Sequence, residues 1–135
     1  MNEWIRMNGR LLLDTNAVVA LFSGEPAATE RFESDDAVFL CVHVLGELRY
    51  GALASARAAE NLMRLDRFSN QLPVLPCDSE TVIHYADIRF RLRRTGKPIP
   101  ENDIWIAATA RQHRLTLLSR DAHFRQVADL DVESF

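Results

Sequence analysis

Hydrophobic residues in this chain gather in short runs that polar segments separate. The runs at 11–13, 37–42 and 115–119 are mostly apolar, and each is only a few residues long. Short continuous apolar runs are typical of strands that are buried on both faces of a sheet. We predict strands at these three places, with weaker strands at 73–77 and in the last few residues of the chain.

Longer segments of mixed polarity lie between the runs and favour helices. The segment at 59–72 is the most regular, because its large apolar residues recur on one helical face. Gly24 and Pro26 close the first helix, and Asp78 or Ser79 caps another. The predicted helices span 17–22, 44–58, 59–72, 79–95 and 121–128, with a further helix that begins near 102.

Short buried strands that alternate with helices predict an α/β fold. In this fold a mostly parallel sheet lies between two layers of helices, as a three-layer α/β/α sandwich. The chain has 135 residues, 47% of them hydrophobic, which is enough to bury a core without disulfides or a structural metal. No repeat, low-complexity tract or long linker divides the sequence. We therefore expect a single domain over 1–135.

Charge and cysteine content limit the possible functions and the location. The net charge of −3 argues against a protein that holds nucleic acid by a general positive field. Cys41 and Cys77 lack metal-ligand spacing, so we expect reduced thiols. The first ten residues lack a signal-peptide core, and no segment approaches the ~20 apolar residues that span a bilayer. We expect a cytoplasmic protein that does not enter a membrane.

Acidic residues recur at the ends of the predicted elements. Asp14 ends the first apolar run, and Asp121 lies two residues beyond the run at 115–119. Functional groups in an open parallel sheet gather beyond the carboxyl ends of its strands, so we expect both acids at one edge. Asp103 lies at the amino end of its helix, where exposed N–H groups and the helix dipole favour a carboxylate.

Glu47 is harder to explain by local structure. It lies one turn inside a predicted helix, among Leu45, Leu48 and Tyr50, where we expect it to be buried. Burial of a carboxylate is costly unless a cation or hydrogen bonds satisfy it. A cation site is the simplest explanation of this acid.

Each acid also has an ordinary structural explanation. Asp14 and Asp121 fit strand ends or helix N-caps, and Asp103 fits a helix cap. Glu47 fits a solvent-facing residue or a partner of Arg49. A shared pocket explains the four acids together, but four carboxylates repel one another and raise one another's pKa unless cations are present.

A hard divalent cation suits such a pocket. Mg²⁺ prefers oxygen ligands and is held by carboxylates together with substrate phosphates, and Mn²⁺ has similar preferences. The histidines do not form a competing cluster, and we assign them to surface or structural positions: His43, His84, His113 and His123. A bound metal of this kind activates water and neutralises a phosphate. The sequence therefore predicts metal-assisted phosphodiester hydrolysis.

Four motifs follow one another along the chain and span nearly all of it: "LLLDTN", "LGELRYGAL", "KPIPENDIWIAATA" and "LLSRDAHF". Together, in this order, they resemble the PIN-domain ribonucleases, and more closely the VapC-type toxins of toxin–antitoxin pairs. The resemblance implies a metal-dependent endoribonuclease with a PIN-like fold. It also implies a homodimer and a VapB-like antitoxin whose C-terminal segment covers the acidic pocket.

The resemblance assigns roles to individual residues. It places the family's acidic active-site residues at Asp14, Glu47, Asp103 and Asp121, with Asn16 and Ser119 as the polar residues that surround them. Asp14 and Asp103 are the direct metal ligands by this assignment. The other two acids either bind the metal, directly or through water, or orient the nucleophile.

Other interpretations stay open. A receiver or haloacid-phosphatase domain also carries strand-end acids, but this chain lacks a paired second aspartate and a lysine after a late strand. A catalytically silent module that binds RNA or antitoxin is the main alternative. The arginines at 89–94 do not form one stripe, and they fit either RNA contact or favourable charges at a helix C-terminus, where Asp87 can pair with Arg91. No motif identifies the RNA target.

Overall fold

The computed structural model describes residues 9–34 and 37–135. The prediction that the chain starts without a signal peptide concerns residues outside these ranges. Within them, none of the helices combines the length and apolarity that a membrane crossing requires.

Five short parallel strands form one central sheet. The strands are β1 (Arg10–Leu13), β2 (Ala37–Cys41), β3 (Val74–Leu75), β4 (Thr116–Leu118) and β5 (Val132–Glu133). Their order is β3-β2-β1-β4-β5, and every neighbouring pair is parallel. The three leucines of β1 are fully buried, which explains why its sequence is continuously apolar rather than alternating.

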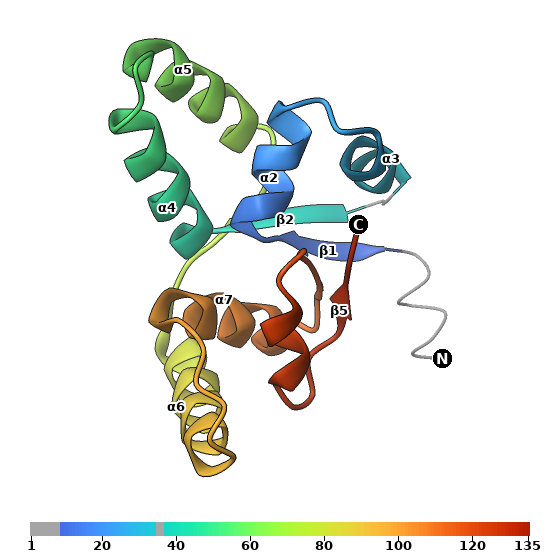
Figure 1. The fold of residues 1–135 in the computed structure, drawn as a ribbon, viewed down its shortest axis with the longest axis vertical. Helices are drawn as coiled ribbons and strands as arrows, with labels where there is room; N and C mark the ends of the chain where they lie inside the picture. The colour runs from blue at the N-terminus through green and yellow to red at the C-terminus, as the bar shows by residue number, and fades with distance from the viewer. Residues whose placement is uncertain (1–8, 35–36) are drawn as a thin grey trace.

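Helices cover both faces of this sheet (Figure 1). They are α2 (Thr15–Phe22), α3 (Pro26–Ser34), α4 (Val42–Leu53), α5 (Ala58–Ser69), α6 (Ser79–Arg94), α7 (Glu101–Gln112) and the 3₁₀ helix η1 (Ala122–Gln126). In the view of Figure 1, α2 to α5 lie above the sheet, and α6, α7 and η1 lie below it. The predicted three-layer α/β/α sandwich is confirmed.

Local differences from the predicted elements have physical causes. Pro26 begins α3 rather than closing the preceding unit, because proline lacks the N–H that the first turn of a helix leaves unpaired. The helix predicted at 44–58 instead spans Val42–Leu53, directly after β2. The short helix predicted at 121–128 is a 3₁₀ helix, and the weak strands are only two residues long.

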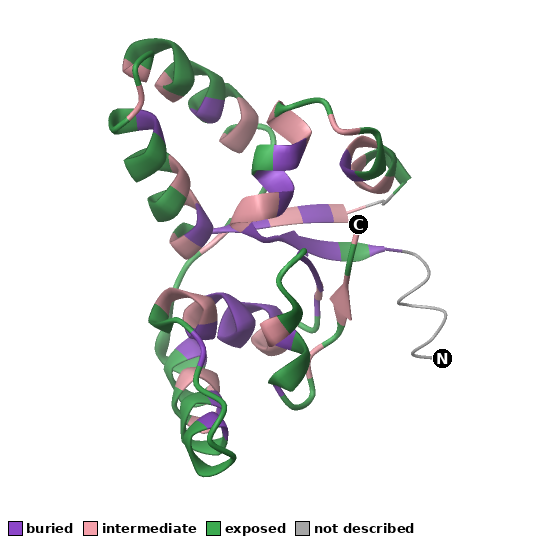
Figure 2. Cartoon of the chain, in the orientation of Figure 1, coloured by how far each residue is buried: buried purple, intermediate pink, exposed green. Residues whose placement is uncertain are grey.

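Helices α6 and α7, below the sheet, differ in burial (Figure 2). Helix α7 is buried along most of its length, including Ile104, Ile106 and the alanines that follow. Helix α6 packs outside α7 and is largely exposed. The apolar run after Asp103 is therefore a core helix, whose amino end carries a carboxylate towards the edge of the sheet.

Candidate metal centre and active site

The four predicted acids line one cavity of about 510 Å³ at the carboxyl edge of the sheet. Strands β1 and β4 are neighbours at this edge, and the chain leaves them towards opposite faces. This is the switch point where open α/β sheets place their ligand sites. Glu25 and Arg120 also line the cavity, and no motif in the sequence marks either of them as a site residue.

Asp14 is the most enclosed acid of the cavity, with 2% of its surface exposed. Its carboxylate accepts from the Thr15 N–H at 2.8 Å and from the Ser119 hydroxyl at 2.6 Å. The pKa of Asp14 is raised to about 6, mainly by burial and to a smaller extent by the charges of Asp103 and Asp121, while the two hydrogen bonds act against this rise. Among the described residues, no basic side chain forms an ion pair with it.

Asp14 is also the N-cap of α2, as one of its ordinary explanations supposed. Capping alone does not explain its environment. An N-cap side chain needs only the exposed end of a helix, whereas the Asp14 side chain is buried. It also accepts a second hydrogen bond, from Ser119, the residue that follows β4. Asp14 therefore both caps α2 and carries a charge that no cationic partner among the described residues compensates.

Asn16 and Ser119 connect Asp14 to Asp121. The Asn16 amide lies 3.3 Å from Ser119 Oγ and 3.4 Å from Asp121 Oδ2, and it donates in both contacts. The Asp121 N–H donates to Ser119 Oγ at 3.0 Å. The two residues that the resemblance placed around the acids thus form a hydrogen-bonded bridge between the amino end of α2 and the loop after β4.

Asp103 is not a helix cap. The N-cap of α7 is Pro100, and Asp103 is the third residue of the helix. Its carboxylate instead contacts His123 Nε2 at 2.8 Å, and its side chain is 14% exposed. Partial burial raises the pKa of Asp103, and the neighbouring His123 acts against that rise.

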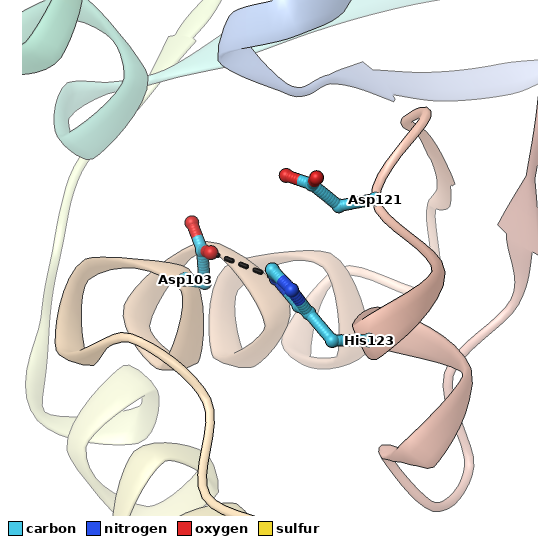
Figure 3. Close-up of side chains that lie close together, drawn as sticks. All are labelled: Asp103, Asp121 and His123. Carbon is cyan, nitrogen blue, oxygen red and sulfur yellow. Dashed lines mark hydrogen bonds and ion pairs between the residues drawn. The ribbon is translucent and has the colours of Figure 1, made fainter.

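His123 lies inside the acidic cluster, and our assignment of it as one of four scattered histidines missed this. Figure 3 shows its ring, which η1 carries, directed towards the Asp103 side chain on α7, with Asp121 of the preceding loop close to both. One ligand atom from each of these three residues lies within 4.8 Å of the others, so the group could hold a metal ion. The available signal was its position two residues after Asp121, although that spacing carries meaning only once η1 is known.

Glu47 reaches the cavity by a different route from the one predicted. It is exposed rather than buried, and Arg49 pairs with Asp66 on α5 rather than with Glu47. Glu47 Oε1 accepts from the Thr15 hydroxyl at 2.8 Å, which fixes it next to Asp14. Its charge also contributes to the raised pKa of Asp103, so it faces the same cluster.

The donor set fits a hard divalent cation. Carboxylate oxygens converge from the junction of β1 and α2, from α4, from α7 and from the loop after β4, and the buried Asp14 has no cationic partner among the described residues. Cys41 lies behind Asp14 as a buried free thiol whose pKa burial raises to about 11, so it does not offer a thiolate. An oxygen-rich set of this kind favours Mg²⁺ or Mn²⁺ over softer metals.

Comparisons with known proteins agree with this geometry. The family model of the PIN domain matches residues 11–130. Ribonuclease VapC2 of Haemophilus influenzae is 32% identical over 129 residues, which cover 93% of this chain and 98% of the relative. The tRNA(fMet)-specific endonuclease VapC of Shigella flexneri is 31% identical over 130 residues, with the same two coverages.

Solved structures give the same result. VapBC2 of Rickettsia felis, bound to a DNA fragment from its promoter, contains a chain that superposes with a TM-score of 0.86 at 25% identity. A chain of the DNA-bound VapBC of Salmonella typhimurium superposes with a TM-score of 0.85 at 28% identity. Each match covers 93% of this chain and 98% of the solved one. The chain therefore belongs to the PIN-domain family, and within it to the VapC-type toxins.

Proposed function

We propose that this chain is a metal-dependent endoribonuclease toxin that hydrolyses RNA phosphodiester bonds in the pocket formed by Asp14, Glu47, Asp103 and Asp121. The observation that carries the proposal is the convergence of four carboxylates from four separate places in the chain, one of which, Asp14, is buried without a cationic partner among the described residues. The similarity to proteins named ribonuclease and endonuclease supports RNA as the substrate.

The four carboxylates would hold Mg²⁺, or Mn²⁺ in its place. When bound, such an ion neutralises charge on the scissile phosphate and lowers the pKa of a coordinated water. Ser119 and Thr15 fix the two oxygens of Asp14, so that this carboxylate cannot rotate away from the pocket. Partners that orient a ligand in this way are worth about 10–100-fold in metal affinity or activity.

The remaining contacts orient the other three acids. Asn16 and the Ser119 hydroxyl hold the loop that carries Asp121. His123 holds Asp103, and the Thr15 hydroxyl holds Glu47. These four contacts preorganise the acids, which lowers the reorganisation that the reaction requires.

Incubation of the purified chain with total RNA, followed by sequencing of the new ends, tests the proposal and identifies the target. We expect cleavage with Mg²⁺ or Mn²⁺, no cleavage in EDTA, and recovery when Mg²⁺ is restored. The matched control is Asp66→Asn, which removes an exposed carboxylate outside the pocket. Full activity in EDTA would exclude the metal-dependent mechanism.

The alternative of a catalytically silent module is less well supported. It requires no acids at all, yet the full set lies in one cavity. A silent module also does not explain why the chain is similar to proteins that are named ribonucleases. Cleavage by the unmodified chain that disappears in Asp103→Asn would exclude it.

The partners of the chain follow from its relatives. The similar solved structures are VapBC complexes, so we propose a VapB-like antitoxin as the partner that inhibits this toxin. A homodimer is part of the same proposal and rests on the resemblance, whereas the cytoplasmic location that we propose rests on the expectation of reduced thiols. Light scattering that shows a monomer at micromolar concentration would remove the dimer without affecting the catalytic assignment.

A further inference from the structure

Arg120 is the one cationic residue among the described residues that line the acidic cavity. Its guanidinium forms a two-pronged ion pair with Glu25, in which Nη1 lies 3.2 Å from Oε2 and Nη2 contacts Oε1. Glu25 is thus a fifth carboxylate at this cavity, in addition to the four proposed metal ligands. A polyanion that approaches five carboxylates needs a cation of the protein to receive it.

The backbone of Arg120 is fixed to the acidic cluster. Its N–H donates to Asn16 Oδ1 at 3.2 Å, and the amide group of the same asparagine contacts Asp121 Oδ2. The guanidinium carbon also lies 4.2 Å from the centre of the Phe135 ring, a cation–π distance. An anion bound by Arg120 would therefore lie beside the carboxylates and not on a remote surface.

The ion pair with Glu25 is easy to exchange. The side chains of Arg120 and Glu25 are 42% and 40% exposed, and exposed ion pairs contribute little to stability. The planar guanidinium fork matches the geometry of a phosphate as well as that of a carboxylate. A phosphate at the cavity can thus take the place of Glu25 at small cost.

The other arginines that the sequence offered are less suitable. On α6, Arg89 pairs with Glu101 at 2.9 Å and Arg91 pairs with Asp87 at 3.0 Å. Neither α6 arginine lines the acidic cavity. These pairs support the structural explanation of the arginines at 89–94 and leave Arg120 as the better phosphate contact.

We propose that Arg120 binds an RNA phosphate next to the metal site, and that Glu25 occupies its guanidinium until RNA displaces it. The inference rests on the proposed ribonuclease function and names a substrate-binding pair for it. Glu25 acts as an internal competitor, so that it weakens the binding of RNA while Arg120 strengthens it. The two partners of one ion pair therefore have opposite effects on the affinity for substrate.

Steady-state cleavage of an RNA oligonucleotide that carries a mapped cut site tests this opposition. The measurement uses saturating Mg²⁺, so that changes in metal affinity do not enter. Arg120→Gln should raise KM about tenfold, because a charge-assisted hydrogen bond to phosphate is lost. Glu25→Gln should lower KM by about threefold, since the guanidinium is then free to bind phosphate without exchange. The double variant should match Arg120→Gln.

The salt dependence of KM gives a second measurement. Each phosphate contact to single-stranded RNA contributes about 0.7 to the slope of log affinity against log salt, so Arg120→Gln should reduce the slope by that amount. Arg49→Gln and Asp66→Asn are the matched controls, because they remove the same charges from an exposed ion pair outside the cavity. Both controls should leave KM and the slope unchanged.

Several results would overturn the inference. Equal increases in KM for Glu25→Gln and Arg120→Gln would show a purely structural ion pair. An effect of Arg49→Gln as large as that of Arg120→Gln would show a general effect of net charge. A lower kcat for Glu25→Gln at saturating Mg²⁺ would place Glu25 among the metal ligands. If the unmodified chain cleaves no RNA, the proposed function fails and takes this inference with it, whereas the preceding results remove the inference alone.

Discussion

The two sides of the acidic pocket are built in different ways. On the sheet side, Asp14 is buried at the end of β1, and hydrogen bonds from Thr15 and Ser119 occupy both of its oxygens. On the helix side, Asp103 is more exposed, and within the described ranges its side chain contacts one polar side chain, that of His123. The sheet side thus holds the charged Asp14 side chain in one orientation without a cationic partner among the described residues. On the helix side, the Asp103 side chain has fewer contacts and more freedom to change its orientation.

The sheet side depends more on a bound cation than the helix side does. A buried carboxylate without a cationic partner destabilises the metal-free protein, because burial disfavours its charged form. A half-buried carboxylate beside a histidine and a helix amino end has part of that compensation already. We expect both acids to be needed for cleavage. Replacement of Asp14 should change the stability of the metal-free protein more than replacement of Asp103.

The largest effect should be the loss of cleavage in Asp14→Asn and Asp103→Asn. Asparagine keeps the shape of either side chain and removes one ligand charge, so we expect each variant to cleave at least about 100-fold more slowly. Mg²⁺ binding by calorimetry should weaken in both. A wild-type cleavage rate and unchanged Mg²⁺ affinity in Asp103→Asn would restrict the metal site to the sheet side.

Stability without metal should separate the two variants. The pKa of Asp14 is raised from 3.8 to about 6 in the folded protein, which corresponds to about 3 kcal/mol of unfolding free energy at neutral pH. Asparagine is as good an N-cap as aspartate, so Asp14→Asn should recover much of this energy in EDTA. Asp103→Asn should recover less, because Asp103 is less buried and His123 opposes its pKa shift. Denaturant unfolding of both variants in EDTA makes the comparison.

The pH dependence of that stability has a definite sign. A carboxyl whose pKa is raised in the folded state binds its proton more tightly there than in the unfolded chain. Its contribution is fully present below pH 3.8 and is lost as the pH rises through about 6. The metal-free wild type should therefore lose stability over this interval, and Asp14→Asn should lose less. An identical pH profile for the two proteins would contradict the uncompensated charge at Asp14.

The sheet side is also the side that sequence alone predicts best. Strand-end acids are visible as an aspartate after a short apolar run, and parallel strands bring such ends together, so Asp14 and Asp121 could be placed at one edge. The fold class followed from the same alternation of strands and helices. Helix α3 could not be predicted in this way, because Pro26 is compatible both with the end of one helix and with the start of the next.

The helix side depends on contacts between distant segments, which local sequence does not encode. Glu47 was expected to be buried because apolar residues flank it, yet the face of α4 that carries it is open to the cavity. His123 and Arg120 became visible only when η1 and the loop after β4 were placed against α7 and α2. Sequence identifies residues at strand ends, whereas tertiary structure decides which side chains from helices and loops join them.

Ser119→Ala should have the next largest effect, because it removes the hydroxyl that joins the buried Asp14 to the Asp121 loop. We expect cleavage to fall about 10–100-fold while the fold is retained. His123→Gln removes the corresponding partner of Asp103 on the helix side, where greater exposure lets water replace the lost hydrogen bond. The loss of cleavage in this variant should therefore lie at the lower end of the same range. Parallel measurements of kcat and Mg²⁺ affinity compare the two. A larger loss in His123→Gln would reverse the proposed order and make the histidine a direct ligand.

The smallest effect should come from Thr15→Val, which removes the contact between the sheet side and Glu47. The Thr15 hydroxyl donates to Glu47 Oε1 at 2.8 Å in an exposed position, so water can replace it when it is lost. The Thr15 backbone N–H still donates to Asp14, and valine keeps the volume of threonine, so neither the cap nor the packing changes. We therefore expect cleavage to fall only about threefold, in line with the modest net value of an exposed hydrogen bond.

Glu47→Gln, measured beside Thr15→Val, supplies the reference, because it removes the charge of Glu47, whereas Thr15→Val removes only the hydrogen bond that orients Glu47. If Thr15→Val costs as much as Glu47→Gln, the orientation of Glu47 matters as much as its charge, and the exposed side of the pocket is as tightly organised as the buried one.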